Sequence, residues 1–215
     1  MDDPSVKILC ALIAIVLLWF AYRHFTAPLV YPPGVLIASD PEQIDLSDQS
    51  FIQHGDFQLK PLARFSVDAR LLHAKRYRWD HQSALVPVDL AVGWGRMSDQ
   101  SVLDQLKISQ SMRFYWYEYR LPPPIPKDEI IRHSTNIHII PANDSIASAC
   151  ESLRAGELIH LEGELVEATG PGIGTWRSSL RRDDSGNGAC ELLLVEKFSK
   201  RGVDPNTAAM RLGKR

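Results

Sequence analysis

Two histidines are the first residues in this chain whose types suggest metal chemistry. They bound the segment His133 to His138. Metal ligands must converge, but residues five apart point to opposite faces of a strand, and on a helix they also lie on different faces. We therefore predict neither a metal site nor a cofactor. On a strand, Ser134, Asn136 and His138 share one face and form a candidate polar cluster.

A cysteine nucleophile with a histidine base is the second candidate chemistry. Cys190 and His138, assisted by Arg182, would make a membrane-tethered hydrolase or transpeptidase. This set resembles the general plan of the sortase transpeptidases, which are membrane-anchored β-barrels with catalytic Cys, His and Arg. The Thr-Leu-x-Thr-Cys signature of that family is absent, and Gly188-Ala189-Cys190-Glu191 stands in its place. The apolar run after Cys190 favours a buried, unreactive thiol, so catalysis is the alternative interpretation.

Charged residues also gather in a glycine-containing loop, where Arg181 and Arg182 precede Asp183 and Asp184. Paired carboxylates and arginines can bind a cation or a phosphate. The loop lacks the Asp-x-Asp-x-Asp-Gly pattern of an EF-hand and the Gly-Lys-Ser of a P-loop. The composition is typical of a solvated hairpin turn.

The chain has three cysteines, and two of them lie in the part expected to be soluble. Cys10 falls in an apolar N-terminal run. Cys150 and Cys190 would form one disulfide if the domain is exported, closing a loop of about 40 residues. In a reducing compartment both would remain thiols.

An aromatic strand is the best candidate for a contact surface. Residues 113–120, RFYWYEYR, alternate so that three tyrosines share one face and Phe114 and Trp116 share the other. One face is expected to be buried and the other to be free to bind a protein or ligand. The predicted binding surface consists of the strand residues and a nearby Gly-Trp-Gly turn: Trp94, Arg113, Tyr115, Tyr117 and Tyr119.

These candidate residues belong to a folded domain, and the N-terminal segment of the chain predicts that this domain is held at a membrane. Ile8 to Tyr22 is uncharged, and Trp19, Phe20 and Tyr22 fall where aromatic side chains meet a membrane interface. We predict a membrane anchor in residues 1–23, with residues 6–22 in the bilayer. A cleaved signal peptide is the weaker alternative because the start of the chain is poorly basic and no good cleavage site follows. A buried core helix is the third interpretation.

The chain after the anchor divides at proline-rich stretches. Residues 24–50 are predicted to be an extended tether, since prolines and a polar run favour solvated extended chain. Residues 51–121 form a first β-rich subdomain with one short helix, which Ser98-Asp99 would cap and which would run to about Ile108. The Pro-rich segment 122–126 then breaks the pattern.

The last third is the most regular part of the sequence. In residues 127–198 we predict a helix, capped by Asn143 and ending near Ala155, followed by an antiparallel meander. Strand count and turn spacing make about 45 of these residues similar to part of an OB-fold or another small β-barrel. The fold class is therefore one transmembrane helix plus a β-rich α+β domain. Residues 199–215 form a basic tail.

Composition excludes disordered, collagen-like and disulfide-dense classes, and the net charge of −2 hides an uneven distribution. From residue 197 onward six basic residues face one acidic residue, giving +5 and leaving −7 for the rest. A body of −7 argues against a nucleic-acid-binding β-barrel, which is the second alternative function. The main hypothesis is a single-pass, extracytoplasmic, non-enzymatic binding or assembly module that contacts an envelope protein.

Overall fold

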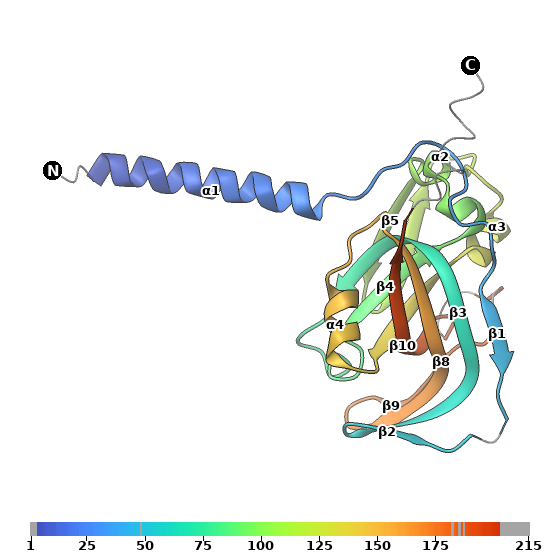
Figure 1. Cartoon of the computed structure of the whole chain (residues 1–215). Coiled ribbons are helices and arrows are strands. Elements are labelled where there is room, and N and C mark those ends of the chain that lie inside the picture. The colour runs from blue at the N-terminus through green and yellow to red at the C-terminus, as the bar shows by residue number, and fades with distance from the viewer. Residues whose placement is uncertain (1–3, 48, 182, 185, 187, 203–215) are drawn as a thin grey trace.

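The computed structural model describes residues 4–47, 49–181, 183–184, 186 and 188–202. One long helix, α1 (Pro4–Thr26), stands clear of a sheet-rich domain (Figure 1). The helix over residues 7–26 is long enough and apolar enough to cross a membrane, and its apolar window is not buried against the domain. At 1.5 Å per residue, α1 measures about 34 Å, which exceeds a hydrocarbon core of about 30 Å. The predicted anchor is therefore a single exposed apolar helix.

Five strands of the domain close into a barrel. They are β3 (Phe57–Arg76), β4 (Val88–Gly93), β7 (Ser134–Pro141), β10 (Glu191–Arg201) and β8 (Leu158–Gly170). Each strand pairs with the next in that order, and β8 pairs back with β3. All pairings are antiparallel except that of β7 with β10, which is parallel. The short strands β1 (Glu42–Asp45), β2 (Ile52–His54) and β9 (Gly174–Arg177) extend the sheet at its edges.

The barrel interior follows directly from the alternation of side chains along these strands. In β3 and β8 the inward positions carry residues such as Phe65, Val67 and Leu161, which are buried. β4 is buried at all six positions because its other face is covered too. Gly163 has no side chain where β10 crosses β8, and a Cβ there would lie 1.9 Å from the carbonyl oxygen of Leu194. Glycine therefore permits the close approach that completes the barrel.

A single helix connects β7 to β8. This helix, α4 (Asp144–Glu151), begins where the Asn143 side chain accepts a hydrogen bond from the Ile146 amide, as the sequence predicts. Ile146 and Cys150 point from α4 into the core. The helix therefore covers one end of the barrel.

The elements between β4 and β7 lie outside the barrel. A short 3-10 turn, η1 (Gly95–Ser98), and α2 (Gln100–Leu103) precede the hairpin of β5 (Leu106–Ser111) and β6 (Phe114–Tyr119), and α3 (Lys127–Arg132) follows. Asp99 caps α2 as expected, but the helix predicted to reach Ile108 ends at Leu103. The remaining residues form β5, because pairing with β6 buries Leu106 and Ile108 partly.

The segment predicted to be a tether is extended, but it is attached to the domain along most of its length. The Leu29 amide donates to the carbonyl of Ala155 at 2.8 Å. Arg70, only 3% exposed, donates to the carbonyl oxygen of Leu29 at 3.3 Å, and its guanidinium lies 5.0 Å from the Tyr31 ring centroid. The amides of Gly34, Leu36 and Ile37 bond to Asp99 and Ser98 side chains. Only a few residues after Thr26 therefore separate α1 from the domain.

Candidate functional site

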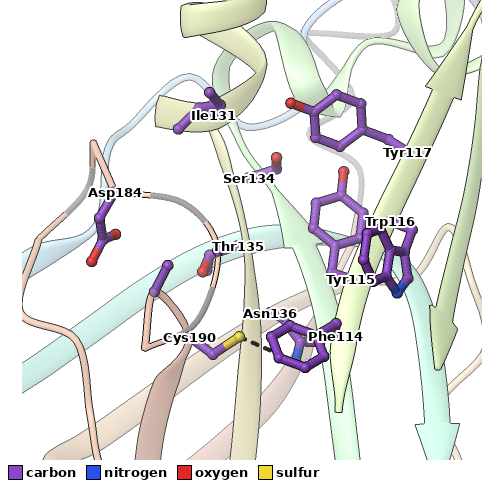
Figure 2. Close-up of a pocket in the computed structure, with 12 residues that line it drawn as sticks. Phe114, Tyr115, Trp116, Tyr117, Ile131, Ser134, Thr135, Asn136, Asp184 and Cys190 are labelled. Carbon is purple, nitrogen blue, oxygen red and sulfur yellow. Dashed lines mark hydrogen bonds between the residues drawn. The ribbon is translucent and has the colours of Figure 1, made fainter. Parts of the chain in front are cut away.

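The β5–β6 hairpin lies over the outer face of the barrel and leaves a cleft beside it (Figure 2). This first cleft, of about 170 Å³, lies between β6, the start of β7 and the loop before β10. Phe114, Tyr115, Tyr117 and Trp116 line one side, and Asp184 and Cys190 lie opposite. Trp116 is 50% exposed at the rim. The cleft therefore offers aromatic surface with a few polar groups.

A second cleft, of about 450 Å³, adjoins the first, because Phe114 and Cys190 line both. Its other walls include Arg113, His138 and Trp176. The His138 and Trp176 ring centroids are 4.7 Å apart. The second cleft is therefore more polar than the first and contains an imidazole.

Arg113, at the tip of the hairpin, holds the hairpin against the barrel. Its guanidinium binds both oxygens of Asp80 at 2.8–2.9 Å and Oδ1 of Asp89 at 3.1 Å. It also donates to the carbonyl of Val86 at 2.9 Å and lies 3.6 Å from the Tyr77 ring centroid. Burial and the nearby Asp89 raise the pKa of Tyr77 to about 12. Tyr77 is therefore a neutral phenol that packs beneath the guanidinium.

The turn that presents Arg113 has an unusual backbone. Met112 and Arg113 have φ values of 49° and 67°, a left-handed conformation that normally selects Asn or Gly in a two-residue hairpin. Such a conformation costs roughly 1–2 kcal/mol for each L-residue with a bulky side chain. The contacts of Arg113 offset this cost, so the geometry of the tip depends on them.

Asp89 and His138 form a buried polar pair under the second cleft. Asp89 is fully buried on β4, and its Oδ1 lies 2.9 Å from Nδ1 of His138. This contact leaves Nε2 of His138 for other partners. Asp89 is not among the residues predicted from the sequence, although a carboxylate within the apolar run VPVDLAVG is a recognisable signal.

A second polar chain runs from the hairpin to the thiol. His73 Nδ1 lies 2.8 Å from Oε1 of Gln110, the Gln110 amide donates to Asn136, and the Asn136 amide lies 3.8 Å from Sγ of Cys190. Asn136 also donates to the carbonyl of Arg113 at 3.1 Å. These bonds explain how buried polar residues persist beneath the hairpin, since each has a partner.

Cys190 has the surroundings of a structural thiol. Burial raises its pKa to about 12, although the Asn136 hydrogen bond acts in the opposite direction. Among the described residues that surround it, Asn136 is the hydrogen-bond partner of the sulfur, and no bond joins it to His138. The predicted Cys190–His138 set is therefore brought to one cleft but not into contact. Arg182 lies outside the described residues, and Arg181 pairs with Asp183 at the exposed surface.

The two cysteines that could pair in an exported domain are not bonded to each other in the structure. Both are free thiols: Cys150 is buried on α4, and Cys190 lies at the clefts. Cys190 precedes β10 and lies beside the start of β7, whereas α4 follows the end of β7. The bridge that was possible in an exported domain is therefore not formed in this structure.

The predicted contact residues divide into three groups. Trp94 is 1% exposed and packs in the barrel core, with its indole nitrogen 3.0 Å from Asp40, so its assignment to a surface was wrong. The tyrosines of β6 face inward onto the cluster around Met97 and Ile130, although Tyr115 and Tyr117 also line the first cleft. Arg113 lines the second cleft. The outward residues of β6 are Phe114, Trp116 and Glu118.

The described basic residues from position 197 onward are paired with acidic residues. Lys197, Lys200 and Arg201 of β10 form ion pairs at 2.7–2.8 Å with Glu162, Glu157 and Asp68, respectively. The remaining tail residues, from 203 onward, lie outside the described residues. Among the residues described, no group of three or more His, Cys, Asp or Glu side chains is arranged to hold a metal ion.

Comparisons of the chain with protein-family models, curated proteins and solved structures found no match.

Proposed function

We propose that this protein is a membrane-anchored, non-enzymatic binding module whose partner occupies the first cleft. The observation that carries the proposal is the row of aromatic side chains on β6 that lines this cleft, with Trp116 half-exposed at its rim. Large aromatic side chains in partly open clefts are typical of contact sites, since they offer much apolar area at low entropic cost.

We further propose that the barrel is OB-like. Its strand order is β3-β4-β7-β10-β8, closed back to β3, with a parallel β7–β10 pair and α4 between β7 and β8. An OB-fold is likewise a five-stranded Greek-key barrel, and it uses loops and one sheet face to bind extended ligands. The first cleft lies on the outer face of β7, which supports a binding role for this face.

The chemistry of the first cleft favours an apolar segment of a partner protein. Its walls combine the aromatic strand with hydroxyl groups of Ser134 and Thr135 and the carboxylate of Asp184. A protruding aromatic or aliphatic side chain would pack on the rings while its backbone bonds to the polar rim. In this proposal the partner is an envelope protein and the domain is extracytoplasmic. A reporter fused to the C-terminus would show on which side of the membrane the domain lies.

Site-specific photocrosslinking tests the proposed cleft. A photoreactive phenylalanine analogue would replace Trp116 in the full chain in its native membrane. The expected result is a discrete crosslinked product, which Ala189→Phe abolishes by filling the cleft. Phe51 is 62% exposed and lies outside the cleft lining, so the same analogue there is the matched control. Identical products at both positions, or products insensitive to Ala189→Phe, would contradict the proposal.

A hydrolase or transpeptidase is the second candidate, and one observation favours it. Asp89 holds Nδ1 of His138, as an orienting carboxylate holds a catalytic imidazole, and Cys190 lines the same cleft. Against it, a nucleophilic thiolate needs a lowered pKa, whereas burial raises the pKa of Cys190 to about 12. The binding module is therefore the better-supported function.

A further inference from the structure

The connection between α1 and the domain is too short to let the domain move freely. Thr26 ends the helix, and Leu29 is already bonded to Ala155. Three residues span at most about 10 Å. Arg154 also donates to the carbonyl of Phe25 at 3.3 Å. If α1 spans the bilayer, the end of the barrel around Ala155 must therefore lie close to the headgroups.

Other segments belong to the same end of the barrel. Arg201, near the end of β10, pairs with Leu158, only three residues beyond Ala155. At the end of β3, the Arg76 guanidinium donates to the carbonyl of Leu153 at 3.1 Å. Figure 1 places α4 on the side of the domain from which α1 departs. We call this end, formed by α4, residues 153–158 and the loop of residues 77–87 that follows β3, the membrane-side end.

The loop of the membrane-side end carries the most exposed large apolar side chain of the described domain. Trp79 is 96% exposed. Met112, which is 78% exposed, lies next to this loop because the neighbouring Arg113 binds Asp80. Lys75 and Arg78 flank Trp79 and are at least partly exposed as well. A tryptophan so exposed buries almost none of its ring within the domain.

The combination of an exposed indole and flanking cations fits one kind of partner. Tryptophan is enriched at membrane interfaces, where its ring is apolar and its N–H reaches water. Lysine and arginine beside it attract lipid phosphates. We propose that the loop around Trp79 inserts its indole into the interface of the bilayer that holds α1, with Lys75 and Arg78 at the phosphates. This inference rests on the membrane anchoring included in the proposed function.

Tryptophan quenching in vesicles tests the insertion. The full chain would be reconstituted into phosphatidylcholine–phosphatidylglycerol vesicles with or without bromine atoms on the acyl chains near the headgroup. Subtracting the emission of Trp79→Phe from that of the parent chain isolates the emission of Trp79. The expected result is that brominated lipid quenches Trp79 as it quenches Trp19 of α1, isolated in the same way with Trp19→Phe.

Trp116 supplies the matched control, because it is exposed at the first cleft rather than at the membrane-side end. Its emission, isolated with Trp116→Phe, should be unchanged by brominated lipid. The inference is overturned if brominated lipid leaves the emission of Trp79 unchanged, as it does that of Trp116, while it still quenches Trp19. In that case the membrane anchor stands and only the insertion of Trp79 is wrong. Loss of quenching at Trp19 as well would overturn the anchor itself.

Discussion

At the scale of single residues, the candidate site depends on a few charged side chains in unusual surroundings. Arg113 is 11% exposed and faces the fully buried Asp89, so each group compensates the charge of the other. Removing Arg113 would leave the fully buried Asp89 carboxylate with His138 as its remaining polar side-chain neighbour in a poorly hydrated place. The hairpin and the clefts beside it therefore depend on this pair more than on any exposed ion pair.

Arg113→Met should lower the free energy of unfolding by about 3–5 kcal/mol, because the Asp89 carboxylate loses its guanidinium partner. Denaturant unfolding of the full chain in detergent micelles would measure the loss. Arg181→Met is the control, since its pair with Asp183 is exposed and should contribute little. Equal effects of the two substitutions would show that Arg113 does not hold the hairpin.

The thiol of Cys190 should react slowly with maleimide at pH 8 in the folded chain and quickly after denaturation. Burial raises its pKa from 9.0 to about 12, so the reactive thiolate is scarce until the pH approaches that value. The same shift disfavours the folded state only above pH 9, where the unfolded thiol ionises and the folded one stays protonated until about pH 12. A Cys10→Ser, Cys150→Ala background isolates this thiol. Fast labelling of the folded chain near pH 7 would support the hydrolase instead.

At the scale of elements, the attachment of residues 29–37 to the barrel is the least expected feature. Gly156 allows it, because its φ of +91° suits glycine and a Cβ there would lie 2.1 Å from the carbonyl oxygen of Leu29. Leu29 and Gly156 are thus in direct backbone contact. The contact joins the anchor segment to the barrel.

Gly156→Ala should release the segment around Leu29 and expose it to chymotrypsin near Tyr31. Limited proteolysis of the full chain in micelles, followed by mass analysis, measures the cleavage. Gly174→Ala is the matched control, since Gly174 has a φ of +61° but no neighbouring group within 4 Å of the place that a Cβ would occupy. If both variants were cleaved alike, backbone strain rather than the Leu29 contact would explain the effect.

Local pattern predicts most elements of this fold, but not their partners. Alternation in residues 157–168 and the aromatic run 113–120 locate β8 and β6, and the cap at Asn143 locates the start of α4. The pairing of β3 with β8 joins residues about a hundred positions apart, and no local pattern specifies its register. For the same reason the sequence reveals Cys190 and His138 but not the contact of His138 with Asp89.

At the scale of the whole molecule, the short connection after Thr26 links the apolar helix closely to the barrel. The basic residues Lys197, Lys200 and Arg201 of β10 form ion pairs with acidic side chains, so their positive charges lie beside negative ones at the surface. The anchor and the membrane-side end together should hold the aromatic cleft at a limited distance from the bilayer.

Ile13→Lys combined with Leu17→Lys should convert the chain from a form resistant to alkaline carbonate extraction to an extractable one. Each lysine near the centre of a spanning helix costs about 2.5–3.5 kcal/mol on insertion scales. Ile13→Leu with Leu17→Ile is the control and should remain in the membrane pellet. An unchanged distribution of the lysine variant would argue that α1 does not span.

The place of β10 in the barrel has a consequence for the order of biosynthesis. β10 lies between β7 and β8, yet it is the last strand to be made. At 5–20 residues per second, synthesis of the chain from β3 to β10 takes on the order of ten seconds. During that time α1 is already available for insertion while the barrel cannot close. If α1 inserts into a bilayer as it is made, the barrel completes its folding after insertion and close to the membrane surface.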